Sequence, residues 1–189
     1  QIGIVLNLVP IYPASEADTD RAAANRLDAY FNRQFLDPLL LGTAPSELAE
    51  MFGSAWPEWT ADELRQIRQR IDYVGVNYYL RLLVCDDATC GPARARAVTQ
   101  PNCPYTAMGW EVYPLGLTEI LVWLKQRYGN LPLYITENGA AFDDVVLPNR
   151  AILDTDRVQY LLEHLRAAQQ ALDAGVDALV VEGVEGGGF

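Results

Sequence analysis

The chain has 189 residues, of which 50% are apolar, so it is long enough to bury a hydrophobic core. It carries 14 basic and 25 acidic residues, which give a formal net charge of −11 and a pI near 4.4. Such an acidic surface repels phosphate backbones and anionic membranes, so we expect neither a nucleic-acid partner nor a membrane partner.

The sequence contains three cysteines, Cys85, Cys90 and Cys103, and a single histidine, His164. An odd number of cysteines does not form a disulfide framework, and one histidine is too few for a Cys/His zinc site, so we expect no metal. No basic segment followed by an apolar one begins the sequence, so no signal peptide is predicted. We therefore expect free thiols and a cytoplasmic location, with a Cys85–Cys90 disulfide as the alternative.

The first part of the chain predicts a strand followed by helices. Residues 2–9 are almost continuously apolar, which is typical of a strand buried on both faces of a sheet. A helix is expected from residue 19 to the Asp37-Pro38 pair, and a shorter one over residues 45–52. The expected apolar face of the first helix consists of Ala23, Leu27, Tyr30, Phe31 and Phe35.

The middle of the chain predicts a third helix, a second strand and a long connection. Thr60 with Glu63 three residues later indicates a capping box at the start of a helix. The second strand is expected over residues 73–79. Residues 80–107 contain three prolines and all three cysteines, and we expect them to form a hairpin-like excursion.

The last part of the chain alternates helices and strands. A helix is expected to end at Gly129, followed by a strand over residues 131–136. A further helix follows, and a fourth strand is expected over residues 176–181. The expected buried stripe of that last helix consists of Val158, Leu161, Leu162, Leu165, Ala168 and Leu172.

Strands that alternate with helices predict an α/β fold with a parallel sheet and right-handed crossovers. Four strands suit half of a (β/α)₈ barrel, and they equally suit a small doubly wound sheet. A complete barrel needs about 200–250 residues, so this chain is too short to form one. We expect a single domain over residues 1–189 that ends in a glycine-rich tail over residues 177–189.

Polar side chains follow the predicted strands, where the active residues of parallel α/β sheets gather. Asn77 and Tyr79 end the second strand, and Glu137 and Asn138 directly follow the third. One carboxylate with a phenol and amides suits hydroxyl-rich ligands and carboxylate-based nucleophilic chemistry. Ordinary structural interpretations stand beside this one, because loop acids are usually solvated, Asn-Gly is a common turn, and strand tyrosines usually pack.

Two other residues bear on function. Trp110 precedes a helix, in a loop where an indole can stack on a sugar ring. His164 is expected to be a surface or boundary residue in the middle of the last helix, and not a general base. The glycines at 186–188 are not followed by a helix, so they do not predict a phosphate-binding loop, and we expect no cofactor.

Together these segments resemble the family 1 glycoside hydrolases, the β-glucosidase family. Residues 131–142, LPLYITENGAAF, resemble the family's nucleophile motif, and IDYVGVNYY at 71–79 and MGWEVYPLGL at 108–117 precede it in the family's order. The resemblance covers nearly all of residues 2–176. It implies an α/β fold that represents strands five to eight of a (β/α)₈ TIM barrel, with their helices.

The resemblance also implies a retaining β-glycosidase that acts on a β-glycoside or an oligosaccharide. Such enzymes use two carboxyl groups about 5–5.5 Å apart. By resemblance, Glu137 is the nucleophile, Tyr79 is the phenol that contacts it, and Asn77 is the amide at the end of the preceding strand. Trp110 resembles the platform of the aglycone site.

Two departures limit what the resemblance implies. The family's acid/base residue lies in an Asn-Glu-Pro motif, and this tripeptide does not occur in the chain. The chain reads DALVVEGVEGGGF after residue 176, where the family has a tryptophan-rich segment, so Glu182 and Glu185 receive no role. We expect little activity from the chain alone, and a partner that is either the missing amino-terminal half or a second copy. The alternative is a non-catalytic half-barrel that self-associates or binds carbohydrate.

Overall fold

The computed structural model describes residues 1–176 and 179–181 of the chain. The chain divides into two compact units, which we describe separately. Unit 1 consists of Gln1–Leu6, Asp72–Leu80 and the chain from Asn102 onward, and unit 2 consists of Asn7–Ile71 and Arg81–Pro101. The single domain expected over residues 1–189 stays a prediction. Most of the expected glycine-rich tail lies outside the described residues.

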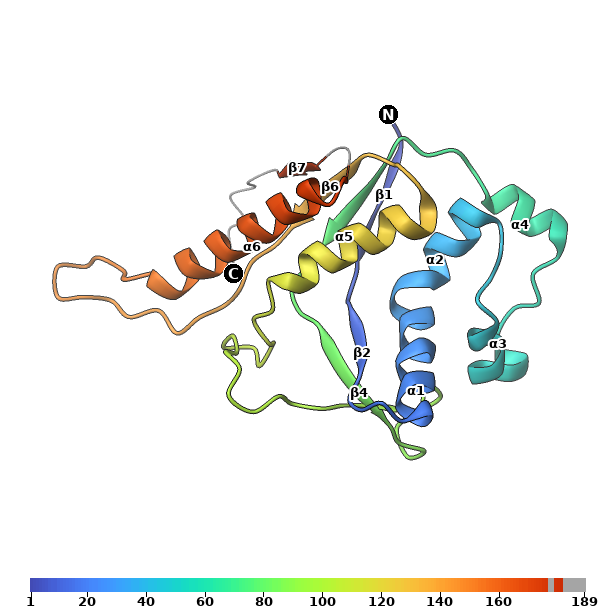
Figure 1. The fold of residues 1–189 in the computed structure, drawn as a ribbon, viewed down its shortest axis with the longest axis horizontal. Helices are drawn as coiled ribbons and strands as arrows, with labels where there is room; N and C mark the ends of the chain where they lie inside the picture. The colour runs from blue at the N-terminus through green and yellow to red at the C-terminus, as the bar shows by residue number, and fades with distance from the viewer. Residues whose placement is uncertain (177–178, 182–189) are drawn as a thin grey trace. The chain divides into compact units, whose positions relative to one another are not determined.

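Unit 1 is built on a four-stranded sheet with the strand order β1-β3-β6-β7 (Figure 1). The strands are β1 (Gly3–Asn7), β3 (Tyr73–Asn77), β6 (Leu133–Glu137) and β7 (Leu179–Val181). Strand β6 runs parallel to both β3 and β7. The spatial order follows the chain order without the reversal that marks a doubly wound sheet, so the sheet is one arc of a (β/α)₈ barrel.

The centre of strand β3 is buried in the sheet of unit 1, since Val74, Gly75 and Val76 are all buried. A Cβ added at Gly75 would lie 2.7 Å from Val5 Cγ2 and 3.0 Å from Thr136 Cγ2, so the glycine makes room for side chains of both neighbouring strands. The expectation that residues 2–9 are buried on both faces is wrong for β1. This strand lies at the edge of the sheet, and Val5 is 46% exposed.

Two helices of unit 1, α5 (Leu115–Tyr128) and α6 (Thr155–Asp173), pack against each other. Helix α5 ends at Gly129, as predicted, and its apolar face is buried. Helix α6 forms as predicted and Ala168 is buried as expected, but the rest of the predicted face is largely wrong, because Val158, Leu161, Leu162 and Leu165 are exposed. The helix instead turns its small residues inward, where they allow close packing. Its buried residues are Tyr160, His164, Ala167, Ala168 and Ala171.

Unit 2 contains a three-stranded sheet with the order β2-β4-β5. Its strands are β2 (Ile11–Pro13), β4 (Leu82–Asp86) and β5 (Ala95–Ala97). Strands β4 and β5 form an antiparallel hairpin, which confirms the hairpin-like excursion predicted within residues 80–107. Helix α1 (Asp18–Asp28) packs on this sheet through Ala23 and Ala24, which contact Val84 in a small apolar core.

Helix α1 continues into π-helical and short helical segments that end at Gly42, which has a φ of 74°. These are η1 (Ala29–Arg33), α2 (Gln34–Leu36) and η2 (Asp37–Leu41). Each π-helical turn adds a residue to the repeat and rotates the buried face. The apolar face predicted from a regular repeat is therefore wrong beyond residue 29. Tyr30, Phe31 and Phe35 are exposed, and Asn32, Arg33 and Leu36 are buried.

Three short helical segments complete unit 2: α3 (Ser46–Phe52), η3 (Gly53–Ala55) and α4 (Ala61–Ile67). The capping box predicted at Thr60 and Glu63 is present, since each side chain bonds the main-chain N–H of the other residue. Among the residues that the structure describes, none of the helices combines the length and apolarity required to cross a membrane.

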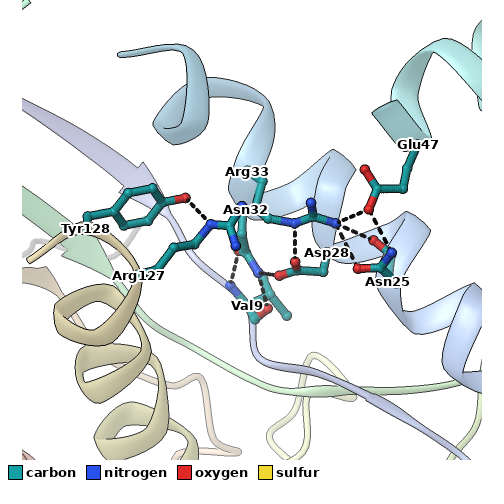
Figure 2. A network of polar contacts seen from close by, with 8 residues as sticks. All are labelled: Val9, Asn25, Asp28, Asn32, Arg33, Glu47, Arg127 and Tyr128. Atoms are coloured by element: carbon teal, nitrogen blue, oxygen red, sulfur yellow. Dashed lines mark hydrogen bonds and ion pairs between the residues drawn. The ribbon is translucent and has the colours of Figure 1, made fainter. Parts of the chain in front are cut away.

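A buried polar network around Arg33 stabilises unit 2 (Figure 2). The Arg33 guanidinium bonds Asp28 Oδ2 at 2.6 Å and Glu47 Oε1 at 3.0 Å, and it also donates to Asn25. Asn32 exchanges hydrogen bonds with the main chain of Val9, at 3.0 and 2.8 Å. The network therefore fixes the helical segments to the chain that leads into β2.

Candidate active site

The carboxyl ends of β3 and β6 bring two of the predicted site residues into contact. Glu137 is the last residue of β6, and Tyr79 lies two residues beyond the end of β3. The Tyr79 hydroxyl donates a hydrogen bond to Glu137 Oε2. Parallel strands end at the same edge of a sheet, which is why two residues 58 positions apart in sequence meet here.

The surroundings of Tyr79 and Glu137 keep the Tyr79 phenol protonated, so that it donates a hydrogen bond to the carboxylate. Burial, followed by the hydrogen bond and the negative charge of Glu137, raises the pKa of Tyr79 to about 12. The phenol therefore keeps its proton at neutral pH and can meet the carboxylate only by donating. Glu137 itself is exposed, so its carboxylate is accessible to a ligand from solvent.

Asn77 lies beside this pair. It is the register partner of Glu137, and the ladder is irregular between Val76 and Asn77. Its side-chain Oδ1 accepts a hydrogen bond of 2.7 Å from Thr136 Oγ1. The amide is thus held at the same sheet edge by a threonine that the sequence analysis did not single out.

Trp110 is the fourth predicted site residue, and it also lies at this edge. Its ring centroid is 5.5 Å from that of Tyr79, with an angle of 52° between the planes. The loop that carries it is closed by Thr106, whose main-chain N–H donates to Trp110 O and whose hydroxyl accepts from Trp110 N. Asn77, Tyr79, Trp110 and Glu137 are therefore gathered in one place.

Two residues behind this edge, Tyr160 and His164, were not expected to support the site. Asn138, one of the polar residues expected at the strand ends, connects to them, because its Nδ2 donates to Tyr78 O at 2.9 Å and to the Tyr160 hydroxyl oxygen at 3.1 Å. The expectation that His164 lies at the surface is wrong, because it is 2% exposed on the alanine-lined face of α6. The signal was the i, i+4 spacing of Tyr160 and His164 on that face.

Cys85 and Cys90 are not joined by a disulfide, as predicted, and Cys85, Cys90 and Cys103 are all half-buried. Over residues 1–176 and 179–181, no group of three or more His, Cys, Asp or Glu side chains is placed to hold a metal ion.

Comparison with known proteins gives one consistent result. The model of glycosyl hydrolase family 1 matches residues 1–181. The chain is 40% identical over 177 residues to a 1,4-beta-D-glucan glucohydrolase of Thermotoga neapolitana, and 40% identical to beta-glucosidase A of Thermotoga maritima. The structure of a family 1 β-glucosidase from Thermotoga maritima superimposes with a TM-score of 0.88 at 38% identity.

These matches cover almost all of this chain and less than half of each relative. The alignment with the Thermotoga neapolitana enzyme spans 93% of this chain and 41% of that protein. The superposition on the Thermotoga maritima structure covers 96% of this chain and 41% of the other. The chain thus spans about two fifths of the length of the relatives it matches, and it belongs to glycosyl hydrolase family 1.

Proposed function

We propose that this chain supplies the nucleophile-bearing part of a retaining β-glycosidase that hydrolyses β-glucoside-like substrates. One observation carries the proposal: a protonated phenol, Tyr79, donates to an exposed carboxylate, Glu137, at the carboxyl edge of a barrel-type sheet. Active residues of such barrels come from this edge. Membership of the family and the names of the relatives support the choice of substrate class.

The arrangement of the pair suits nucleophilic attack. Tyr79 binds Oε2, and the described residues provide no hydrogen-bond partner for Oε1, which is left to attack the anomeric carbon. The bond from that carbon to the aglycone oxygen breaks as the bond to Glu137 forms. Water then displaces the carboxylate from the opposite side, so the configuration is retained after two inversions.

Two neighbours of the pair fit substrate binding. The half-buried indole of Trp110, next to Tyr79, offers an apolar face for the aglycone. Asn77 offers an amide for sugar hydroxyl groups at the same edge. A Thermotoga maritima relative has a solved structure in complex with deoxynojirimycin, which supports a sugar-shaped ligand.

The proton for the leaving group must come from elsewhere. The Asn-Glu-Pro sequence that carries the acid in the family does not occur in these 189 residues. We therefore propose that activity requires the rest of a barrel, supplied by an amino-terminal half or a second copy. We also propose a cytoplasmic location, which the absence of a disulfide between Cys85 and Cys90 supports.

Covalent trapping tests this proposal. The chain is incubated with 2,4-dinitrophenyl 2-deoxy-2-fluoro-β-glucoside, alone and with the amino-terminal part of a family 1 barrel, and the peptide that contains Glu137 is analysed by mass spectrometry. We expect an adduct on Glu137 in the mixture, slower labelling by the chain alone, and negligible hydrolysis of an alkyl glucoside by the chain alone. Ordinary turnover of cellobiose by the pure chain would contradict the need for a partner, and an unlabelled Glu137 in the mixture would contradict the role of nucleophile.

One observation favours the alternative of a non-catalytic half-barrel that self-associates or binds carbohydrate. Helix α6 exposes Val158, Leu161, Leu162 and Leu165, each at least 41% exposed, and their spacing places them on one side of the helix. Light scattering tests self-association, and a fully dispersed monomer with a cooperative melt would contradict it. Binding of cellobiose that Glu137→Gln leaves intact, without any covalent adduct in the unsubstituted chain, would support this alternative.

A further inference from the structure

We propose that Tyr160 on α6 is a positioning residue, whose phenol oxygen holds the Asn138 amide and through it the Tyr79–Glu137 pair. The functional meaning of this inference rests on the proposed role of Glu137 as a nucleophile. The geometry on which it stands lies wholly within unit 1.

Asn138 joins the two chain segments that carry the pair. Its Nδ2 has two hydrogens, of which one is donated to Tyr78 O at 2.9 Å and the other to the Tyr160 hydroxyl oxygen at 3.1 Å. The Tyr78 main-chain N–H in turn donates to Glu137 O at 2.9 Å. Residue 78 is therefore bonded in both directions to residues 137 and 138, and its neighbour Tyr79 carries the phenol that contacts the carboxylate.

Tyr160 is itself held in place by its surroundings. It is 1% exposed, and it stacks on His164 with ring centroids 3.9 Å apart and 27° between the planes. Phe142 meets it edge-on at 6.3 Å. The ring therefore has little freedom, and a group bonded to its oxygen is placed by the packing of α6.

His164 extends this packing to the other segment. Its Nδ1 lies 2.7 Å from Tyr160 O, and because a carbonyl oxygen only accepts, Nδ1 carries the proton. Its ring centroid is 5.8 Å from that of Tyr78, which is fully buried. His164 thus packs between Tyr160 and Tyr78, the two residues that Asn138 bonds.

A purely structural role would need only the ring of Tyr160. A phenylalanine would fill the same space without the cost of a buried hydroxyl group, which is about 1–3 kcal/mol when the group has no partner. The partners that offset this cost are the side-chain amide of Asn138 and the main-chain N–H of Gly139, the two residues that directly follow Glu137. The other polar atom of the stacked pair, His164 Nε2, has no partner among the described residues, so the phenol oxygen is the group that connects this packing to the site.

The test uses the 189-residue chain and two measurements that do not depend on activity. Tyrosines are labelled with ¹³C at Cζ, and the Tyr79 signal is identified by its loss in Tyr79→Phe. In Tyr160→Phe we expect the Tyr79 signal to shift, because its contact with Glu137 loosens. We also expect exchange of the Tyr78 amide to accelerate by roughly 5–10-fold, as for the loss of one hydrogen bond, without acceleration in the middle of α5.

Tyr128→Phe is the matched control. Tyr128 is also a tyrosine of unit 1 whose oxygen accepts a bond from a side chain, that of Arg127 (Figure 2), but it is the last residue of α5. It should leave the Tyr79 signal and the Tyr78 amide unchanged. An unchanged Tyr79 signal in folded Tyr160→Phe would overturn the inference, and so would equal shifts in both variants.

A second variant keeps the test decisive if Tyr160→Phe does not fold. Asn138→Ala removes the amide and leaves the ring of Tyr160 and its packing in place, and it should produce the same shift and the same local exchange. An unchanged signal in this variant would overturn the inference. Labelling of Glu137 by the fluoroglucoside is measured separately, so a chain that shows the shift without labelling would contradict the proposed function alone. Labelling with an unmoved Tyr79 signal would contradict the positioning role alone.

Discussion

The polar network around Arg33 in unit 2 and the Tyr79–Glu137 pair in unit 1 use charged groups in opposite ways. Arg33 is 8% exposed at its side chain and is bonded by two carboxylates and an amide. Glu137 is exposed and bonded through one oxygen to a phenol. A buried charge stabilises a fold only while all its partners are present, because removing one leaves the others buried and unpaired. An accessible carboxylate with an unpaired oxygen can instead react with a ligand.

The largest expected effect comes from removing the reactive oxygen. Glu137→Gln should lower labelling by the fluoroglucoside, measured in the mixture with an amino-terminal barrel part, by about 10⁴-fold or more, because an amide cannot form the glycosyl ester. The free energy of unfolding should change by less than about 0.5 kcal/mol, since the residue is exposed and the amide oxygen still accepts from Tyr79. Glu58→Gln, at an exposed acid of unit 2, is the control and should change neither quantity. Labelling that survives Glu137→Gln would show that Glu137 is not the carboxylate that reacts.

For the polar network around Arg33 we expect a large loss of stability, the reverse of what we expect at Glu137. Arg33→Met should lower the free energy of unfolding by about 3 kcal/mol, measured in urea, because Asp28 and Glu47 lose the cation between them. Arg21→Met is the matched control, since Arg21 is more than half exposed in its ion pairs with Glu16 and Asp18, and should cost less than about 1 kcal/mol. Equal losses in the two variants would show that burial of the network adds nothing to its strength.

A third prediction concerns the packing behind the site. A Cβ at Gly116 in α5 would overlap the Tyr78 hydroxyl oxygen and lie 2.9 Å from Tyr113 Cδ1. Gly116→Ala should therefore destabilise the protein by about 1–3 kcal/mol, although alanine favours helices. At Gly139 a Cβ would meet nothing within 4 Å, so Gly139→Ala is the control and should be nearly neutral in the same urea experiment. A neutral Gly116→Ala would mean that Tyr78 can move aside.

The site was more predictable from sequence than the helix faces, for a physical reason. Strand ends of a parallel sheet converge whatever the details of packing, so placing Asn77, Tyr79 and Glu137 at such ends was sufficient to expect them together. The resemblance to a known motif then selected Glu137 from among ordinary loop acids. Trp110 needed the resemblance as well, because a lone tryptophan in a loop is weak evidence.

The helix faces required information that periodicity does not contain. The stripe of Val158, Leu161, Leu162 and Leu165 shows which residues of α6 share a face, but not toward which neighbour that face turns. The inward-facing alanines of α6 allow this helix to approach α5 closely. Tyr160 and His164 lie on the same face as the alanines and are therefore buried too. In the first helix, the π-helical segment at Ala29–Arg33 rotated the buried face, and no residue pattern signalled that insertion.

The smallest expected effect is a difference between the two units in how their stability depends on pH. Burial lowers the pKa of His164 from its ordinary value near 6.5, so the folded chain binds this proton less readily than the unfolded chain does. The stability of unit 1 should therefore fall as pH drops below about 6.5, by at most about 1.4 kcal/mol per pH unit, until the lowered pKa is reached. His164 is the only histidine in the chain, so unit 2 has no group of this type and should stay level between pH 5 and 6.5. Hydrogen exchange of amides in α5 and in α1, corrected for its intrinsic dependence on pH, measures the two units side by side. His164→Gln should abolish the slope in unit 1, and a slope that persists in this variant would assign the effect to carboxyl groups instead.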